Sequence, residues 1–374
     1  MKSYLFLLIW ACFLGFSCEE ANNDPAPSSS VAGDLPLLNS GQHLGMIVGF
    51  NPSNPAATTD SIEARWQEAV QAGMSIGRVQ IDWPELEPEP GEYDKGALQG
   101  VLEDLENQGL QPFLTLAAYD SEGPVVPDYL EGISFDDPQI STQFALLMDW
   151  VIPMLVEYQG WAITISNEPD NAFAEEPGLA DEILVFLRNS RTHIHQINDE
   201  MAVTVTFNIG NLAQSRTDMQ KLRDEMDVAS FNIYGSGLFP IDRPYSPQEI
   251  RDEIDAILDF TGEQNIVFQE VGMHTNQPLL NSSEEIQKTF FTTFFQVMEN
   301  EPRMKAAYVF QLVDWSTETI EFFNTLYEPG TPQSFIDQYS AVLASLGLIQ
   351  YENGQRKAAW NEFIQWIETF SQTQ

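Results

Sequence analysis

Residues 161–170 read WAITISNEPD, and residues 265–273 read NIVFQEVGM. In both stretches a short run of apolar, largely β-branched residues predicts a buried strand. Each run leads directly into a carboxylate, Glu168 in the first stretch and Glu270 in the second. Because parallel strands end at one edge of a sheet, these two carboxylates are expected on the same face of the molecule.

The same pattern extends along the chain in both directions. Short apolar runs alternate with longer amphipathic segments, which is typical of strand–helix units in a parallel sheet. Eight such units fit a single (β/α)8 barrel over residues 37–374 better than a doubly wound sheet. The predicted strands are Leu44–Phe50, Ile76–Ile81, Pro112–Ala118, Ala162–Ser166, Ala202–Phe207, Val228–Asn232, Ile266–Gln269 and Ala306–Leu312.

Several residues mark the ends of the predicted helices. Asp60 with Glu63 has the spacing of a capping box, and glycines stand where helix C-terminal caps are expected. In the last predicted helix, near 356–370, four apolar side chains at helical spacing are expected to pack against the barrel. The glycines are Gly73, Gly109 and Gly262, and the four apolar residues are Trp360, Phe363, Trp366 and Ile367.

The N-terminus predicts an export signal. Lys2 precedes an apolar run that is shorter than the roughly 20 residues of a transmembrane helix. The segment resembles a bacterial lipoprotein signal, in which residues 1–17 are removed and Cys18 is lipidated. Phe16 departs from the small residue usual in such signals, and a cut by ordinary signal peptidase near Ser17 is the alternative. Residues 18–36 are polar and rich in Ser, Pro, Asn and Asp, which predicts a flexible tether.

Charge and cysteine content exclude several kinds of site. The 374-residue chain has 56 acidic and 16 basic side chains, for a formal net charge of −40. Nucleic-acid binding is excluded, since it depends on clustered Lys and Arg, and the only membrane contact we expect is a lipid anchor on Cys18. The two cysteines, Cys12 and Cys18, both lie in the leader region, so the mature domain has no internal disulfide and no Cys-ligated metal.

The two strand-end carboxylates suggest glycoside hydrolysis. That reaction uses one carboxyl group to protonate the leaving oxygen and a second to attack the sugar or to direct water. Glu168 and Glu270 offer one candidate for each role. If the two carboxyl groups lie as close together as this reaction requires, they are not readily ionised at the same time, so one of them is expected to keep its proton.

The motif Asn-Glu-Pro at 167–169, with a second Glu ending the seventh strand, resembles the retaining β-glycosidases of glycoside hydrolase clan A. Family 5 and the related families 10, 39 and 42 belong to that clan. The segment from Trp83 to Asp94 is similar to the W…EP.PG.YD stretch of these enzymes. Tyr119-Asp120 departs from the clan pattern, because several members have a His after the third strand. Three further residues match clan positions, and they are Arg78, Tyr234 and Trp315.

The resemblance implies a role for each matched residue. Glu270 would be the nucleophile, stabilised as an anion by Arg78 and Tyr234, and Glu168 would be the general acid and base. Asn167 would donate to the sugar 2-hydroxyl, and no metal or organic cofactor is implied.

Some of these residues have a structural alternative. Trp315 would be a sugar platform, whereas Trp83 fits either a platform or packing beneath a loop. Tyr119 and His274 are candidates for lining the substrate site, and a structural role for His274 fits equally well. Arg78 could instead pair with an acid in the lower barrel.

We therefore predict an exported, retaining hydrolase of β-linked, neutral polysaccharide or oligosaccharide, anchored at the bacterial outer membrane. Endo-action is favoured over exo-action, since no segment that would cap the cleft follows the barrel. Two alternatives use the same barrel: a surface glycan-binding protein without catalysis, and a transglycosylase that resolves the intermediate with sugar instead of water.

Overall fold

The computed structural model describes residues 41–47, 59–121, 123–237, 239–241, 243–325, 327 and 330–372. The predicted leader (1–17), the tether (18–36) and Cys18 lie outside the described residues. So do residues 48–50 at the end of the predicted first strand.

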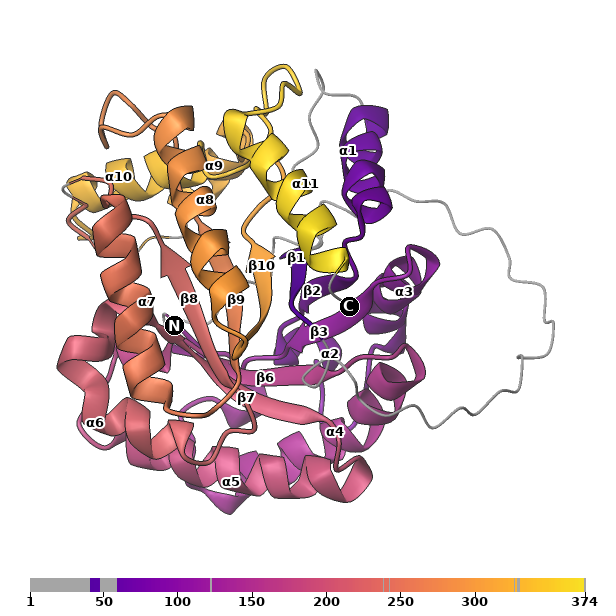
Figure 1. Cartoon of the computed structure of the whole chain (residues 1–374). Helices are drawn as coiled ribbons and strands as arrows, with labels where there is room; N and C mark the ends of the chain where they lie inside the picture. Colours follow the sequence, from indigo (N-terminus) through magenta and orange to yellow (C-terminus); the bar gives the residue numbers. More distant parts are fainter. Residues whose placement is uncertain are drawn as a thin grey trace.

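The described part of the chain forms a closed barrel of eight parallel strands, as predicted (Figure 1). Each barrel strand pairs with its neighbours in chain order, and the first strand pairs with the last to close the cylinder. A separate two-stranded sheet, β4 (Tyr119–Asp120) with β5 (Gly123–Pro124), follows the third barrel strand. The barrel strands are β1 (His43–Ile47), β2 (Ile76–Gln80), β3 (Gln111–Thr115), β6 (Ala162–Asn167), β7 (Ala202–Asn208), β8 (Ala229–Tyr234), β9 (Ile266–Gly272) and β10 (Met304–Val309).

Helices surround the barrel and connect its strands (Figure 1). The long helices are α1 (Thr59–Ala72), α3 (Lys95–Asn107), α4 (Pro138–Glu157), α5 (Leu179–Ile197), α6 (Leu212–Arg223), α7 (Pro247–Thr261), α8 (Glu284–Asn300) and α11 (Ala358–Ser371). Shorter elements lie in the loops at the carboxyl ends of the strands: α2 (Trp83–Leu86), α9 (Thr317–Asn324), α10 (Gln333–Leu343), and the 3-10 turns η1 (Asp128–Leu130), η2 (Pro169–Asn171) and η3 (Ile209–Asn211).

The helix ends follow local chemistry. Ser246 and Glu249 form a complete capping box at the start of α7, and Gly262 ends that helix with φ of 61°. Gly73 follows α1 with φ of 111°, and a Cβ at this position would lie 2.5 Å from the side chain of Ser371 in α11. Glycine is therefore required at position 73 both by conformation and by the close approach of the last helix.

The barrel interior has two layers of different chemistry. At the amino ends of the strands the rings of Phe113, Trp161 and Tyr308 pack together, with Phe113 5.5 Å from Trp161 and 5.4 Å from Tyr308 between ring centroids. At the carboxyl ends the interior is filled by hydrogen-bonded polar side chains instead. The polar layer supports the face on which the loops of a barrel carry function.

Outside the strands, a larger apolar core lies between the barrel and its helices. As predicted, α11 contributes Trp360, Phe363 and Ile367 as buried residues, and Trp366 packs at the edge of this core. Among the described helices, α4 alone is long and apolar enough to span a membrane by composition. Its Phe144 and Leu147 are fully buried in the core, so this apolar character is explained by packing within the domain.

The EP.PG.YD stretch has a structural function. Glu87 is fully buried, and its carboxylate accepts hydrogen bonds from the indole N–H of Trp83 at 2.8 Å and from the backbone N–H of Gly91 at 2.9 Å. Asp94 caps the start of α3 by accepting from two backbone N–H groups. Trp83 is itself fully buried and packs edge-on against Phe144. The packing interpretation of Trp83 is thus correct, and the expectation that it faces a sugar is wrong.

Candidate active site

A β-bulge turns two consecutive residues of β9 toward the barrel interior. The register with β8 is regular up to Phe231–Phe268 and then pairs Asn232 with Glu270, which leaves Gln269 as the extra residue. In a regular strand neighbouring side chains point to opposite faces. Here both Gln269 and Glu270 bond to interior side chains, because the bulge adds one residue to the strand.

Glu270 is held by two donors. The guanidinium of Arg78 on β2 donates to one carboxylate oxygen at 2.9 Å, and the hydroxyl of Tyr234 at the end of β8 donates to the other. Arg78 is fully buried, and Glu270 is 8% exposed. A buried cation and a phenol directed at the same carboxylate stabilise its ionised form. The alternative pairing of Arg78 with an acid in the lower barrel is therefore wrong.

Arg78 is itself fixed by neighbours on the inner face of the barrel. Its Nε donates to Thr115 at 2.8 Å, and its second terminal nitrogen donates to Gln80 at 2.7 Å. Gln80 lies two residues after Arg78 on β2, so both side chains point inward. The planar guanidinium thus has a separate acceptor on each side, and its orientation toward Glu270 is fixed.

Glu168 occupies a strained backbone position at the end of β6. Its φ of 49° and ψ of 39° lie in the left-handed region, which costs a non-glycine residue about 1–2 kcal/mol. Pro169 follows directly and disfavours the right-handed helical region for the residue before it. The backbone N–H of Glu168 donates to Thr206 at 2.7 Å, which helps to hold the turn. Strain of this kind is retained where the side-chain direction matters.

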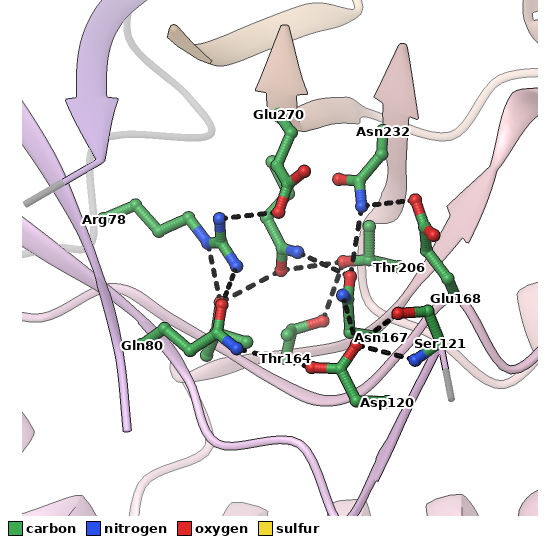
Figure 2. Close-up of polar contacts among 12 residues, drawn as sticks. Arg78, Gln80, Asp120, Ser121, Thr164, Asn167, Glu168, Thr206, Asn232 and Glu270 are labelled. Atoms are coloured by element: carbon green, nitrogen blue, oxygen red, sulfur yellow. Dashed lines mark hydrogen bonds and ion pairs between the residues drawn. The ribbon is translucent and has the colours of Figure 1, made fainter. Parts of the chain in front are cut away.

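Asn232 links the two carboxylates. It pairs with Glu270 in the β8–β9 register, and its amide donates to Glu168 at 2.9 Å (Figure 2). Burial and the nearby charge of Glu270 raise the pKa of Glu168 to about 8, while the hydrogen bond from Asn232 opposes the shift. At neutral pH the site therefore contains a protonated carboxyl, Glu168, beside a carboxylate, Glu270.

Asn167 is the centre of the hydrogen-bond network in Figure 2. Its carbonyl oxygen accepts from Gln269 at 2.8 Å and from Asn232 at 3.2 Å, and its amide donates to Asp120 at 2.9 Å. One of its two amide hydrogens is thus engaged, and within the described part of the chain the other has no acceptor.

Below this network the hydroxyls of Thr115 and Thr206 donate to the carbonyl oxygen of Gln269 at 3.1 and 2.9 Å. The polar layer connects the strand ends into one rigid unit.

Asp120, beyond the end of β3, is 3% exposed. It accepts from Asn167, from Gln80 at 3.3 Å and from the backbone of its neighbour Ser121. The side chain of Asp120 thus orients the amide of Asn167, because an amide N–H needs an acceptor.

A second acidic residue, Asp82, is buried just beyond β2. Burial, together with the charges of Glu85 and Asp120, raises the pKa of Asp82 well above its ordinary value.

Three other predicted site residues, Tyr119, His274 and Trp315, are mostly buried. Tyr119 and His274 are 3% and 1% exposed, and the Tyr119 ring packs edge-on against Phe135. Burial and the charge of Lys357 lower the pKa of His274 to about 4, so the ring is neutral. Tyr119 thus packs in the apolar core, and the buried, neutral ring of His274 fits the structural alternative for that residue. Trp315 is 6% exposed, donates to Gln311 and packs on Phe323, so most of its surface is already covered.

Sequence reasoning missed four members of the network: Gln80, Asn232, Gln269 and, except as a departure from the clan pattern, Asp120. A signal for them exists. Arg78 and Gln80 alternate on β2, and Ser230 and Asn232 alternate on β8, so polar side chains recur on one face of otherwise apolar strands. Such alternation predicts a polar barrel interior at the carboxyl ends of the strands.

Solved structures with a similar fold are glycosidases. An exo-β-1,4-mannosidase from Opitutaceae bacterium strain TAV5 is 15% identical, with a TM-score of 0.63 over 88% of this chain. This chain spans 60% of that protein's length. A GH5_18 variant from Bifidobacterium longum subsp. longum, in complex with Manβ1-4GlcNAc, is 14% identical with a TM-score of 0.64, covering 88% of this chain and 78% of that one. A β-glucosidase is 14% identical with a TM-score of 0.59, covering 83% of this chain and 87% of that one.

No protein-family model matches the sequence, and no curated protein matches it either. The structural likeness establishes the fold, a single (β/α)8 barrel of the kind found in these glycosidases.

Proposed function

We propose that this protein is a retaining hydrolase of β-linked glycosides. The proposal rests on one observation: a carboxyl whose pKa is raised to about 8, Glu168, lies beside a carboxylate held by a buried Arg, Glu270, at the carboxyl end of one barrel. Glycosidases of the double-displacement type use such a pair, with one group protonated and the other ionised.

In the first step Glu270 attacks the anomeric carbon of the sugar, and the bond from that carbon to the leaving oxygen breaks. Glu168 transfers its proton to the leaving oxygen, which departs as an alcohol. Glu270 is then joined to the sugar as an ester. The free amide hydrogen of Asn167 donates to a ring hydroxyl of the bound sugar, and Asp120 fixes its direction.

In the second step water attacks the anomeric carbon, Glu168 accepts a proton from that water, and the ester bond to Glu270 breaks. The electrostatics favour this change of role. Esterification removes the charge of Glu270, which is one cause of the raised pKa of Glu168. The pKa of Glu168 therefore falls once the ester forms, and the same group becomes a base.

Charge and the structural neighbours support one substrate class. A net charge of −40 disfavours anionic glycans, so a neutral β-linked polysaccharide or oligosaccharide is the better match. The neighbours named above act on or bind β-mannosides and β-glucosides, which makes manno- and gluco-configured substrates the first to test. We retain endo-action as part of the proposal, and the product pattern tests it.

The deciding experiment combines activity with stereochemistry. Purified protein is incubated with β-mannan, β-glucan and xylan and with the corresponding 4-nitrophenyl β-glycosides, and the first-formed anomer is read by NMR. Net retention is expected. Glu168→Ala and Glu270→Ala are expected to lower turnover by at least about 100-fold. Wild-type turnover in both variants, or an inverted product, contradicts the proposal.

The same experiment separates the alternatives. Binding of a polysaccharide without new reducing ends, unchanged in Glu270→Gln, favours a glycan-binding protein. Longer oligosaccharides formed at high substrate concentration favour transglycosylation.

We further propose export and lipid anchoring through Cys18, with the tether at 18–36 holding the barrel away from the outer membrane. Only the leader region contains cysteine, which simplifies the test. In the natural host, the wild-type protein is expected in the membrane fraction with a lipid mass on its N-terminal peptide. A Cys18→Ala variant is expected to lose both. A mature N-terminus near residue 18 without lipid favours ordinary signal peptidase.

A further inference from the structure

Four aromatic rings from two loops form a cluster at the carboxyl end of the barrel, which we call the aromatic rim. The two loops are the one between β8 and α7 and the one that includes α10. The rim consists of Phe239, Tyr327, Phe335 and Tyr339. Phe335 is central: its ring centroid lies 5.0 Å from Phe239, 5.7 Å from Tyr327 and 5.6 Å from Tyr339.

Direct hydrogen bonds join the two halves of the aromatic rim. The side chain of Gln338 in α10 accepts from the backbone N–H of Ile241 at 2.9 Å and donates to the carbonyl of the same residue at 3.3 Å. Figure 1 shows α10 beside the start of α7, where the first loop ends. Because the loops are bonded to each other, the rings of the rim are held in place before any ligand binds.

The aromatic rim lies next to the candidate active site. Tyr234 donates to Glu270, and the loop containing Phe239 begins directly after Tyr234. Burial and the charge of Glu270 raise the pKa of Tyr234, and Tyr339 lies close enough to add to the shift. A ligand extending from Glu270 toward α10 would therefore come near Tyr339.

The exposed side chains of the rim are aromatic, whereas the other large exposed apolar side chains of the described residues are all aliphatic. Six large hydrophobic side chains are exposed among the described residues, and the two aromatic ones, Phe239 at 41% and Tyr339 at 42%, both belong to the rim. Aromatic faces pack well against the C–H groups of a pyranose ring. An exposed aromatic surface of this kind is better suited to binding a sugar than to binding an aliphatic surface of another protein.

We propose that the aromatic rim is an additional sugar-binding subsite, which binds a residue of a neutral β-linked oligosaccharide away from the bond being cleaved. The inference rests on the proposed glycosidase function and extends it, because it makes chain length a determinant of specificity. Substrates long enough to reach the rim gain binding energy that a monosaccharide glycoside lacks.

The test compares substrates of different length in matched variants. Tyr339→Ala and Phe239→Ala remove the exposed rings and leave Phe335 at the centre of the packing. Leu146→Ala on α4, exposed by 46%, is the control for loss of a large exposed apolar side chain. For each protein, kcat/KM is measured on manno- and cello-oligosaccharides from dimer to hexamer and on 4-nitrophenyl β-glycosides. Unfolding temperatures verify that the fold is retained.

The expected result is a fall of about three- to tenfold per ring in the ratio of hexamer to 4-nitrophenyl glycoside kcat/KM. The ratio for Leu146→Ala is expected to equal that of wild type. Wild-type ratios in both rim variants, with hydrolysis intact, overturn the subsite while the glycosidase proposal stands.

Binding gives an independent measure. In a Glu270→Gln background, calorimetry with mannohexaose and cellohexaose is expected to show the same loss of affinity on Tyr339→Ala. This arm tests the subsite even if wild type hydrolyses none of the probes, the outcome that would reject the proposed function. Hexamer affinity that does not change with the rim variants overturns the subsite. So does a rim substitution that changes only the sedimentation coefficient, because that result would assign the rim to contacts between protein molecules.

Discussion

At the scale of single residues, the strongest consequence of the structure concerns the proton on Glu168. Its pKa is raised from an ordinary 4.5 to about 8 in the folded protein. Between these two values the folded state binds more protons than the unfolded state. Stability therefore falls as pH rises through this window, which is the opposite of the usual carboxylate.

A Glu168→Gln substitution tests this sign. The amide does not titrate, so the variant lacks the loss of stability that wild type suffers as pH rises. The unfolding temperature of the variant minus that of wild type is expected to increase from pH 4.5 to about pH 8 and to level off above it. Each kcal/mol corresponds to about 1–2 °C in a domain of this size. A difference that is constant with pH contradicts the raised pKa.

Asn232 is expected to tune the same group. Its amide donates to Glu168 and lowers the pKa of that carboxyl relative to burial alone. An Asn232→Leu substitution removes the donor, so the basic limb of the kcat/KM profile is expected to move to higher pH, with kcat lower by about tenfold or more. Asn189→Leu, which removes a donor to Ser141 on the outer helices, serves as control. A basic limb unchanged from wild type shows that Asn232 is merely structural.

At the scale of the elements, sequence patterns predicted all eight strands and the packing of the last helix. They also predicted that Glu168 follows a strand end, whereas Glu270 was expected at the end of its strand and instead lies within β9, which continues to Gly272. They did not predict the bulge at Gln269, because strand pattern and composition do not reveal that one residue of a strand has no partner on the neighbouring strand. Two consecutive polar residues at a strand end, Gln269 and Glu270, were the available hint. Long-range partners such as Asp120 with Asn167 depend on the closed barrel and have no local signal.

A buried ion pair joins the start of α11 to the loop after β10, and we expect it to hold the last helix against the barrel. Lys357 donates to Asp314 at 2.6 Å, to Ser345 at 2.9 Å and to Thr275 at 3.2 Å. Burial raises the pKa of Asp314 to about 6 even with this partner. Lys357→Met leaves the carboxylate buried without its cation, and we expect a loss of about 3–5 kcal/mol near neutral pH.

Two controls accompany this prediction. The loss is expected to shrink below pH 6, because Asp314 then takes up a proton. Lys221→Met, which removes an exposed pair with Asp181, is expected to cost at most about 1 kcal/mol. Equal losses in the two variants, measured by urea unfolding, contradict the role of burial.

At the scale of the whole molecule, the net charge of −40 dominates. Like charges repel in the compact state, and added salt reduces the repulsion as the screening length falls from about 10 Å at 0.1 M to about 3 Å at 1 M. The unfolding temperature is therefore expected to rise with NaCl concentration over this range. Calorimetry at fixed pH measures it. A falling unfolding temperature would indicate that attractive ion pairs outweigh the general repulsion.

The extra residue in β9 has an evolutionary implication. Loss of a single codon at position 269 would remove the extra residue and leave Glu270 directly after Phe268, opposite Asn232 in a regular register. The carboxylate of residue 270 would keep its inward direction, but the amide oxygen that accepts from Thr115 and Thr206 would be lost. Such a deletion would keep the attacking group of the proposed reaction and remove part of the polar support beneath it.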